Sequence, residues 1–362
     1  MSESKPPTFR NTSLLLIILT LIAGVALGWL LRDRFSPPVA LAPTPDSTVL
    51  PARAPSVTAA PVAVLPPVAP TTPPQADIAL PPIPSRTPAP KPAPVAAMAA
   101  GYAGHVVEQG ETLATIAAHG GSTPELIARY NLLEGQPSPG RMLIVPRVAG
   151  ADSTLESAPL LVQRGRVDKP WLALTLDAGA DAAPVPAMLK TLREHKVKIT
   201  FFLTGKWIKE NPDLARQIVA DGHEIANHTF THPDMRHLSD AAISKELADT
   251  EALLAETTGA SSRPFFRPPF GAYDERVLRL AVGAGYLPIY WTLDSLDSVG
   301  EPKTPDFLFE RITAKLTPDK LRGAIILAHC GSLPTADALP RILDRFAEMG
   351  LKVKKVSEVL GS

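Results

Sequence analysis

The chain has 362 residues, of which 36 are Lys or Arg and 36 are Asp or Glu, so its formal net charge is zero. Binding to nucleic acid requires a basic surface that displaces counterions, and we therefore expect no nucleic-acid partner. The single cysteine, Cys330, excludes an internal disulfide but does not indicate a redox compartment.

The first 35 residues predict a membrane anchor. Residues 14–31, "LLLIILTLIAGVALGWLL", carry no charge, and at ~1.5 Å per residue such a helix spans ~27 Å, close to the thickness of a bilayer core. A cleaved signal peptide is the alternative, because residues 40–42 (Ala-Leu-Ala) resemble a cleavage site. Its apolar region is usually shorter, however, and the charged residues 32–34 intervene. We expect residues 1–35 to form an uncleaved single-pass anchor.

Residues 36–103 predict a linker rich in proline and alanine, as in "APVAVLPPVAPTTPPQ". Proline removes a backbone donor and fixes φ, which excludes regular helices and strand ladders. We expect a disordered, extended tether of up to ~3.1 Å per residue. A ligand for SH3-type domains is the alternative, but the tract lacks flanking basic residues.

Residues 104–148 predict a small module with the order strand–helix–helix–strand. The β-branched runs "HVV" (105–107) and "MLIVP" (142–146) bracket two segments of helical period. The second helix begins at Ser122-Thr123-Pro124, a capping residue followed by proline in the first turn.

This pattern resembles a LysM module. The resemblance implies binding to glycans that contain N-acetylglucosamine, such as peptidoglycan, although the family often has Asp where Glu111 stands. A small domain without a ligand is the alternative. The residues at the family's signature places, and hence the expected glycan contacts, are Gly110, Glu111, Thr112, Leu113, Asn131 and Leu132.

From residue 164 to residue 362, apolar strand-like segments alternate with amphipathic helical segments. Strands are expected at 171–177, 198–204, 223–228, 264–270, 286–294 and 324–330, and helices at 186–196, 211–222 and 239–259 among others. Apolar strands separated by helices predict an α/β domain with a parallel sheet, and this length suits a complete or incomplete (β/α) barrel. A doubly wound open sheet is the alternative, but no G-x-G-x-x-G follows the first strand.

Polar side chains stand at the ends of these predicted strands. The carboxyl ends of parallel strands form one rim, where barrels carry their chemistry, so we expect the side chains to meet there. They are Asp177, His228, His232, Arg267, Asp294 and His329.

His228 and His232 are four residues apart, so one helical turn would direct both imidazoles to one point, as in many zinc sites. The spacing of His223 and His228 does not fit H-E-x-x-H, which excludes a zincin metalloprotease. Ordinary surface or core histidines are the alternative, but with Asp177 and His329 nearby a metal site is favoured.

Five ordered motifs from about residue 170 to residue 360 resemble those of the NodB-type polysaccharide deacetylases, carbohydrate esterase family 4. They are "TLDAG", "HTFTH", "RPPFG", "WTLDSLDS" and "ILAH". The resemblance implies a distorted (β/α) barrel that removes N-acetyl groups from amino-sugar polymers with the help of a divalent metal. From the histidine spacing we expect this metal to be zinc.

The resemblance also implies a role for each residue. Asp177 would be the base, with Arg267 paired to it, and the backbone N–H of Phe270 would stabilise the oxyanion. His329 would protonate the departing amine, held cationic by either Asp294 or Asp297. Ser298 stands where the family often has Trp.

One position departs from the family pattern. The usual second aspartate, a metal ligand, is Ala178 here. Three outcomes stay open: Asp181 completes a site with His228 and His232, the two histidines and waters hold the metal more weakly, or the metal is lost. Asp181 is also placed to cap the following helix.

The sequence therefore predicts a single-pass membrane protein with an extracytoplasmic deacetylase domain, on the periplasmic or cell-wall side. Its expected partners are peptidoglycan or another glycan containing N-acetylglucosamine, and the membrane. A non-catalytic glycan-binding protein and an O-deacetylase of a polysaccharide ester are the alternatives.

Overall fold

The computed structural model describes residues 100–148 and 158–361. These belong to the second of two compact units, residues 86–362. The predicted anchor (1–35) and most of the linker (36–103) lie outside the described residues. Within the described ranges, no helix is both long and apolar enough to cross a membrane.

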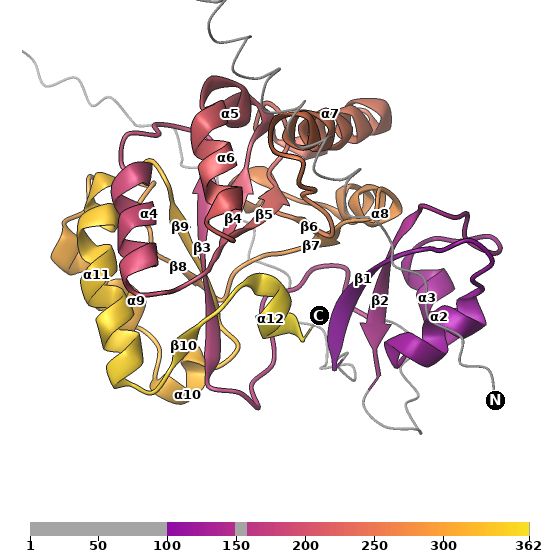
Figure 1. Ribbon diagram of the computed structural model, residues 1–362, viewed down its shortest axis with the longest axis horizontal. Coiled ribbons are helices and arrows are strands. Elements are labelled where there is room, and N and C mark those ends of the chain that lie inside the picture. The colour runs from indigo at the N-terminus through magenta and orange to yellow at the C-terminus, as the bar shows by residue number, and fades with distance from the viewer. Residues whose placement is uncertain (1–99, 149–157, 362) are drawn as a thin grey trace, which may run out of the picture. The chain divides into compact units, whose positions relative to one another are not determined.

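The first described part has the predicted strand–helix–helix–strand order: β1 (Gly101–Val106), α2 (Leu113–Gly120), α3 (Pro124–Tyr130) and β2 (Met142–Arg147) (Figure 1). The two strands pair antiparallel. The side chains of Thr112 and Thr123 cap the two helices, and Pro124 occupies the first turn of α3 as expected. Buried side chains from both helices and β2 form a separate small core.

The second part is built on a curled parallel sheet with the order β7-β6-β5-β4-β3-β9-β8. Its strands are β3 (Trp171–Ala178), β4 (Thr200–Leu203), β5 (Glu224–Asn227), β6 (Phe265–Phe266), β7 (Leu287–Pro288), β8 (Leu293–Asp294) and β9 (Ile325–His329). β10 (Lys352–Val353) pairs with the start of β3. All six predicted strands are confirmed, although those at 264–270 and 286–294 are shorter or interrupted.

The two edge strands of this sheet are pieces of one extended segment. β7 pairs with β6, and the backbone N–H of Ile289 donates to the carbonyl of Phe266 at 2.7 Å. Four residues after β7 the segment reaches the other edge, where β8 pairs with β9. A chain this short can join the two edges only if the sheet curls, so the sheet forms a distorted barrel rather than a doubly wound open sheet.

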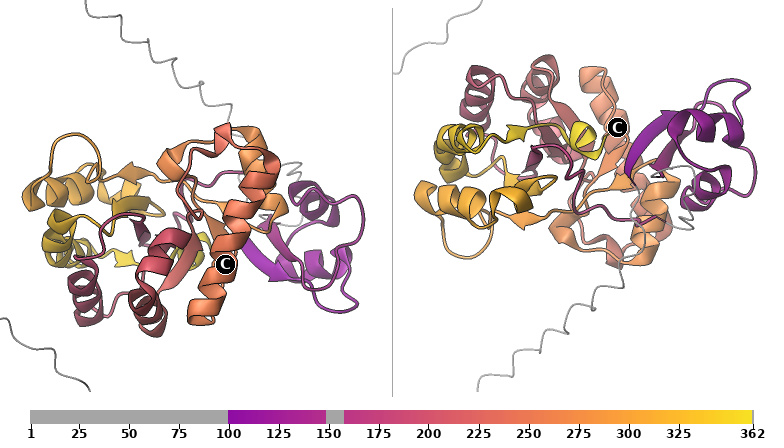
Figure 2. Two further views of the ribbon diagram at one scale, coloured as in Figure 1. Left: turned by 90° about the horizontal axis from the view of Figure 1, so that it is seen from above. Right: turned by 90° about the horizontal axis from the view of Figure 1, so that it is seen from below.

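Helices surround the outer face of the curled sheet (Figures 1 and 2). They are α4 (Val185–Glu194), α5 (Gly205–Glu210), α6 (Pro212–Ala220), α7 (Asp240–Thr258), α8 (Glu275–Gly283), α9 (Pro305–Ala314), α10 (Pro318–Leu321) and α11 (Leu333–Glu348), with short 3-10 turns at Met235–His237 and Pro269–Gly271. The last helix, α12 (Val356–Leu360), packs instead in the cluster on the inner face of the sheet. The three helices expected at 186–196, 211–222 and 239–259 are confirmed as α4, α6 and α7.

The alternation of side chains along β3 positions the site. Leu174 and Leu176 pack in the apolar cluster that joins the sheet to the helices. The residues of β3 that alternate with them point to the other face of the sheet, where Ala173 belongs to the inner core. Asp177 is on this inner face at the carboxyl end of the strand, whereas Ala178 returns to the helix-facing cluster.

Candidate active site

A cavity of about 610 Å³ opens at the carboxyl ends of the strands. Most of the predicted catalytic and metal-binding residues contribute to its wall. The lining residues are Asp177, Gly179, Ala180, His228, His232, Pro268, Phe270, Gly271, Trp291, Asp294, Asp297, Ser298, Val299, Leu327, His329, Gly331 and Ser332.

Asp177 and Arg267 form a buried ion pair beneath this cavity. Nη1 of Arg267 lies 2.5 Å from Oδ1 of Asp177, and the two side chains are 0% and 5% exposed. The guanidinium also donates to the hydroxyl of Thr175, at 2.9 Å, and it stacks on the ring of Phe202. Burial lowers the pKa of Arg267, but Asp177 opposes this shift. The pairing expected from the family resemblance is present, and it fixes the orientation of the Asp177 carboxylate.

His228 stands directly after β5 and faces Asp177. Its Nδ1 lies 2.9 Å from the carbonyl oxygen of Arg267, which can only accept a hydrogen bond, so Nδ1 carries the proton. Its Nε2, 3.6 Å from Oδ2 of Asp177, is left with a free lone pair. Burial lowers the pKa of His228 to about 4, so this imidazole is neutral at pH 7 and can bind a cation or accept a proton.

His232 reaches the same point through a loop, and the prediction of a helical turn is wrong. Thr229 and His232 have φ angles of 66° and 62° in the left-handed region, which a regular α-helix does not use. The two imidazole rings nevertheless lie 4.8 Å apart, in an edge-to-face arrangement. The four-residue spacing predicted the meeting of the rings but not its geometry.

The carboxylate of Glu246, on α7, holds this loop. It accepts hydrogen bonds from the backbone N–H groups of Phe230 (2.7 Å) and Thr231 (2.8 Å) and from the hydroxyl of Thr231 (2.8 Å). The sequence analysis missed Glu246, because nothing in the local sequence of α7 distinguishes it from the other acidic residues of that helix.

The structure distinguishes Asp297 from Asp294 as the partner of His329. Oδ1 of Asp297 lies 2.7 Å from Nδ1 of His329, and Oδ2 accepts the backbone N–H of the same histidine at 2.9 Å. Asp294 instead accepts the backbone N–H of Leu296 at 2.8 Å, within its own turn. Asp294 lines the cavity without a hydrogen bond to His329, so Asp297 is the residue that orients the imidazole.

The pair shifts the titration of both of its members. Burial alone would raise the pKa of Asp297, but the hydrogen bond and charge of His329, with a further hydrogen bond from Thr335, outweigh burial and lower it. Burial alone would lower the pKa of His329, but its hydrogen bond to Asp297 and the negative charges of Asp177, Asp297 and Asp294 raise it. Each group thus favours the charged form of the other.

Phe270 and Ser298 lie at the mouth of the cavity. The Phe270 side chain is 71% exposed, and its ring lies 4.4 Å from that of His232. Its φ is 59°, so the backbone turns sharply at the position expected to donate to the oxyanion. The hydroxyl of Ser298 lies 3.3 Å from Nε2 of His329.

The third predicted metal ligand is not in the cavity. Asp181 is exposed, and its Oδ1 accepts the backbone N–H of Ala183 at 3.0 Å in the turn before α4. The N-cap of α4 is Pro184 and no side chain caps this helix, so the alternative role of Asp181 as its cap is also wrong. Ala178 is 1% exposed among apolar side chains. Among the residues that the structure describes, no group of three or more His, Cys, Asp or Glu is arranged to hold a metal ion. A zinc site usually has at least three protein ligands, so the donors present do not fit a complete one.

The glycan-binding residues expected in the small module differ in their exposure. Leu113 and Asn131 are buried. Leu113 packs in the small core, and the Asn131 side-chain amide forms hydrogen bonds with the backbone of Ile127 and Ile144, so Leu113 and Asn131 both have a structural role. The other four predicted residues, namely Gly110, Glu111, Thr112 and Leu132, keep at least part of their surface accessible to a ligand.

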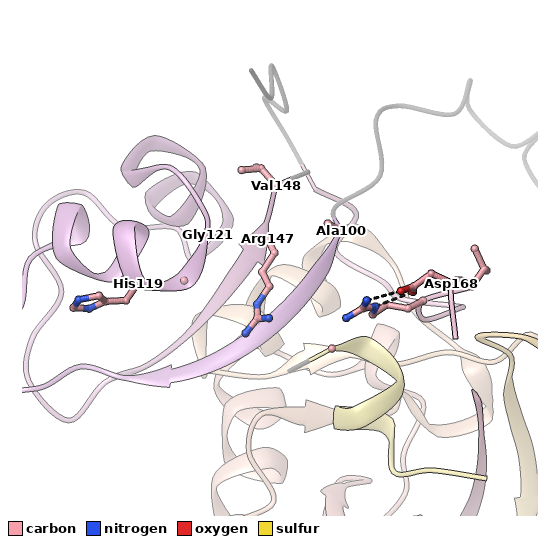
Figure 3. A pocket seen from close by; sticks show the side chains of 10 residues that line it. Ala100, His119, Gly121, Arg147, Val148 and Asp168 are labelled. Atoms are coloured by element: carbon pink, nitrogen blue, oxygen red, sulfur yellow. Dashed lines mark hydrogen bonds and ion pairs between the residues drawn. The ribbon is translucent and has the colours of Figure 1, made fainter. Parts of the chain in front are cut away.

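Figure 3 shows a second cavity, of about 620 Å³. Arg166 donates two hydrogen bonds to Asp168 on its wall, at 2.9 and 2.6 Å, while His119 lies on the opposite side. The lining residues therefore include no paired imidazole and carboxylate, and we place the candidate active site in the cavity at the strand ends.

A curled parallel sheet that gathers a buried Asp–Arg pair, two imidazoles and an Asp–His pair at the carboxyl ends of its strands defines a polysaccharide deacetylase domain. The profile of the polysaccharide deacetylase family matches residues 164–289. Over 192 residues, the chain is 30% identical to the peptidoglycan-N-acetylglucosamine deacetylase of Bacillus cereus, covering 52% of this chain and 67% of that one. The chain belongs to this family, whose deacetylases are hydrolases that act on the amide C–N bond of N-acetyl groups.

Other similar proteins are described as uncharacterized or as a pseudoenzyme. The uncharacterized protein YlxY of Bacillus subtilis is 33% identical over 202 residues, which are 56% of this chain and 61% of YlxY. The structure of BA3943 from Bacillus anthracis, described as a pseudoenzyme of carbohydrate esterase family 4, is 32% identical with a TM-score of 0.53, covering 59% of this chain and 73% of that one. A BA3943 mutant with the same identity and TM-score, covering 61% and 77% of the two chains, is described as having restored enzymatic activity.

Proposed function

We propose that this protein removes N-acetyl groups from the amino sugars of a cell-wall polysaccharide, most specifically peptidoglycan. The observation that carries the proposal is the presence of two complete proton-handling pairs in one cavity, Asp177 with Arg267 and His329 with Asp297. Hydrolysis of an amide requires a base for the nucleophile and an acid for the departing amine. The similarity to a peptidoglycan-N-acetylglucosamine deacetylase supports the choice of substrate.

Each pair has a separate task in this reaction. Asp177, oriented by its ion pair with Arg267, accepts the proton of the attacking water. His329, oriented by Asp297, delivers a proton to the amine as the C–N bond breaks. The backbone N–H of Phe270 donates to the oxygen on which negative charge develops.

The cofactor that we propose is zinc, bound weakly by His228 and His232. The family's deacetylases are generally metal-dependent, and such a metal polarises the acetamide carbonyl and activates water. Because Ala178 supplies no ligand and Asp181 lies outside the cavity, no step assigned above to the residues of this chain depends on the metal.

The remaining parts of the chain would bring this site to its substrate. We propose that residues 104–148 are a LysM module that binds peptidoglycan and that residues 1–35 anchor the chain in the membrane, with the catalytic domain on the extracytoplasmic side. Tethering and glycan binding both raise the local concentration of substrate without a new catalytic contact.

The test is acetate release from peptidoglycan by the full chain. Asp177→Asn should lower the rate by about 10²–10⁴-fold, the usual contribution of a general base. The matched control is Asp181→Asn, which makes the same substitution outside the cavity and should keep the wild-type rate. Equal rates for wild type and Asp177→Asn would refute the proposed base.

A non-catalytic glycan-binding protein is the second candidate, and a specific observation favours it. The described residues contain no complete metal site, and a similar structure is that of a family 4 pseudoenzyme. This candidate predicts that the full chain is retained on insoluble peptidoglycan while releasing no acetate, with or without added zinc.

A further inference from the structure

Ser298, which the proposed deacetylation does not use, completes a chain of hydrogen-bonding groups with His329 and Asp297. Its Oγ lies 3.3 Å from Nε2 of His329, and Nδ1 of that imidazole lies 2.7 Å from Oδ1 of Asp297. Ser298 and Asp297 belong to the loop after β8, whereas His329 ends β9. A serine, an imidazole and a carboxylate in this order have the arrangement of a nucleophile, its base and the residue that orients the base.

The tautomer of His329 follows from its partners. The carboxylate of Asp297 can only accept a hydrogen bond, so the neutral imidazole carries its proton on Nδ1. Asp297 is itself fixed by hydrogen bonds from Ser295 (2.8 Å), Thr335 (2.7 Å) and the backbone of His329 (2.9 Å). Nε2 of His329 is therefore an acceptor that faces the hydroxyl of Ser298, as a general base must.

Exposure increases along the chain of groups toward the substrate. The side chain of Asp297 is 0% exposed, that of His329 is 28% exposed, and Ser298 is exposed at the mouth of the cavity. The carboxylate is shielded from water, which strengthens its interaction with the imidazole, while Oγ of Ser298 is accessible to an acetyl group. The distance of 3.3 Å is at the loose end of the range found for a nucleophile and base without substrate.

We propose that Ser298, His329 and Asp297 form a nucleophilic triad that transfers acetyl groups from acetyl esters and N-acetyl amino sugars through an acetyl-Ser298 intermediate. The inference rests on the proposed function for the natural substrate, and it gives an alternative first step in which Ser298 replaces the water activated by Asp177 as the nucleophile. It also gives the site a nucleophile that needs no metal, in a chain whose third metal ligand is replaced by Ala178.

The steps balance without a further reactant besides water. Oγ of Ser298 adds to the acetyl carbonyl carbon while its proton moves to Nε2 of His329. The C–N bond, or the C–O bond of an ester, breaks as His329 gives that proton to the leaving group. Water then adds to acetyl-Ser298 and passes a proton to His329, which returns it to Oγ of Ser298 as acetic acid leaves and ionises.

The test uses the full chain in excess EDTA with two probes, p-nitrophenyl acetate and a fluorophosphonate, and intact-mass and peptide mass spectrometry. Wild type should gain one acetyl or phosphonyl group, located on Ser298. Ser298→Ala and His329→Gln should each slow labelling by at least about 10²-fold. Ser332→Ala removes the other serine on the cavity wall, whose hydroxyl bonds Thr335 at the start of α11, and should label like wild type.

Acetate release from peptidoglycan by the same proteins separates the two proposals. Label on Ser298 supports the triad, whether or not acetate is released from peptidoglycan. The absence of acetate release would refute the proposed function but not the triad. Acetate release that is equal in wild type and Ser298→Ala, without any adduct on Ser298, would overturn the triad and leave the proposed function standing. Label on another residue would also overturn it.

Discussion

Arg267 and Asp177 meet in a fully enclosed ion pair, with Nη1 2.5 Å from Oδ1 and neither side chain more than 5% exposed. The pair joins the end of β3 to the segment after β6. Removing one member of such a pair leaves a buried charge without compensation.

Arg267→Ala should therefore lower the free energy of unfolding by about 3–5 kcal/mol, measured by denaturant titration. The double variant Asp177→Ala/Arg267→Ala should be less destabilised than the sum of the two single variants, since it leaves no unpaired charge. Arg279→Ala is the control, because its partner Glu275 is exposed and the loss should stay below about 1 kcal/mol. Equal losses for Arg267→Ala and Arg279→Ala would contradict the buried pair.

Asp297→Asn should lower the pKa of His329, measured by NMR titration of its ring protons. The hydrogen bond and charge of Asp297 raise this pKa in the wild type, and without them burial should bring it below its ordinary value. A group whose pKa is raised on folding stabilises the folded state below its unfolded pKa, and this contribution is lost as the pH rises through the folded pKa. The stability difference between wild type and variant should thus be larger at pH 5.5 than at pH 8.5. A difference independent of pH would contradict this coupling.

Glu246→Ala should destabilise the protein by about 1–3 kcal/mol, because two backbone N–H groups in the loop between the histidines lose their acceptor. The same variant should weaken any binding of zinc, measured by calorimetry, since His232 is no longer held beside His228. Glu256→Ala, an exposed substitution on the same helix, should change stability by less than about 0.5 kcal/mol. Unchanged stability in Glu246→Ala would show that the loop does not depend on this carboxylate.

Asp181→Ala tests the alternative third metal ligand. The structure predicts a loss of about 0.5–1.5 kcal/mol in unfolding free energy, the net contribution of the one hydrogen bond to Ala183. Zinc affinity should remain at the wild-type value, because the carboxylate lies outside the cavity. A collapse of zinc affinity in this variant would instead make Asp181 a ligand.

The local sequence predicted the strands because their apolar runs and flanking helices are local signals. It also placed Asp177, Arg267 and His329 at strand ends, and the structure brings all three to one cavity. The pairing of Arg267 with Asp177 followed from the family resemblance rather than from spacing.

Features that depend on tertiary contacts could not be predicted in the same way. The sequence does not show whether Asp294 or Asp297 is the partner of His329. Only the path of the loop after β8 places the carboxylate of Asp297 beside the imidazole. The left-handed φ of Thr229, a β-branched residue, has no local signal, and it led to the wrong prediction of a helical turn. The role of Glu246 depends on the packing of α7 beside a loop that precedes it in the chain.

The most direct test of the proposed function is to count acetate and new amino groups together, on peptidoglycan treated with the full chain. An N-deacetylase releases one acetate for each free amino group that it creates, and this equality is the predicted result. Acetate without new amino groups would identify an O-deacetylase, and retention of the protein on the glycan with neither product would identify a non-catalytic binder. Either result would contradict the proposal.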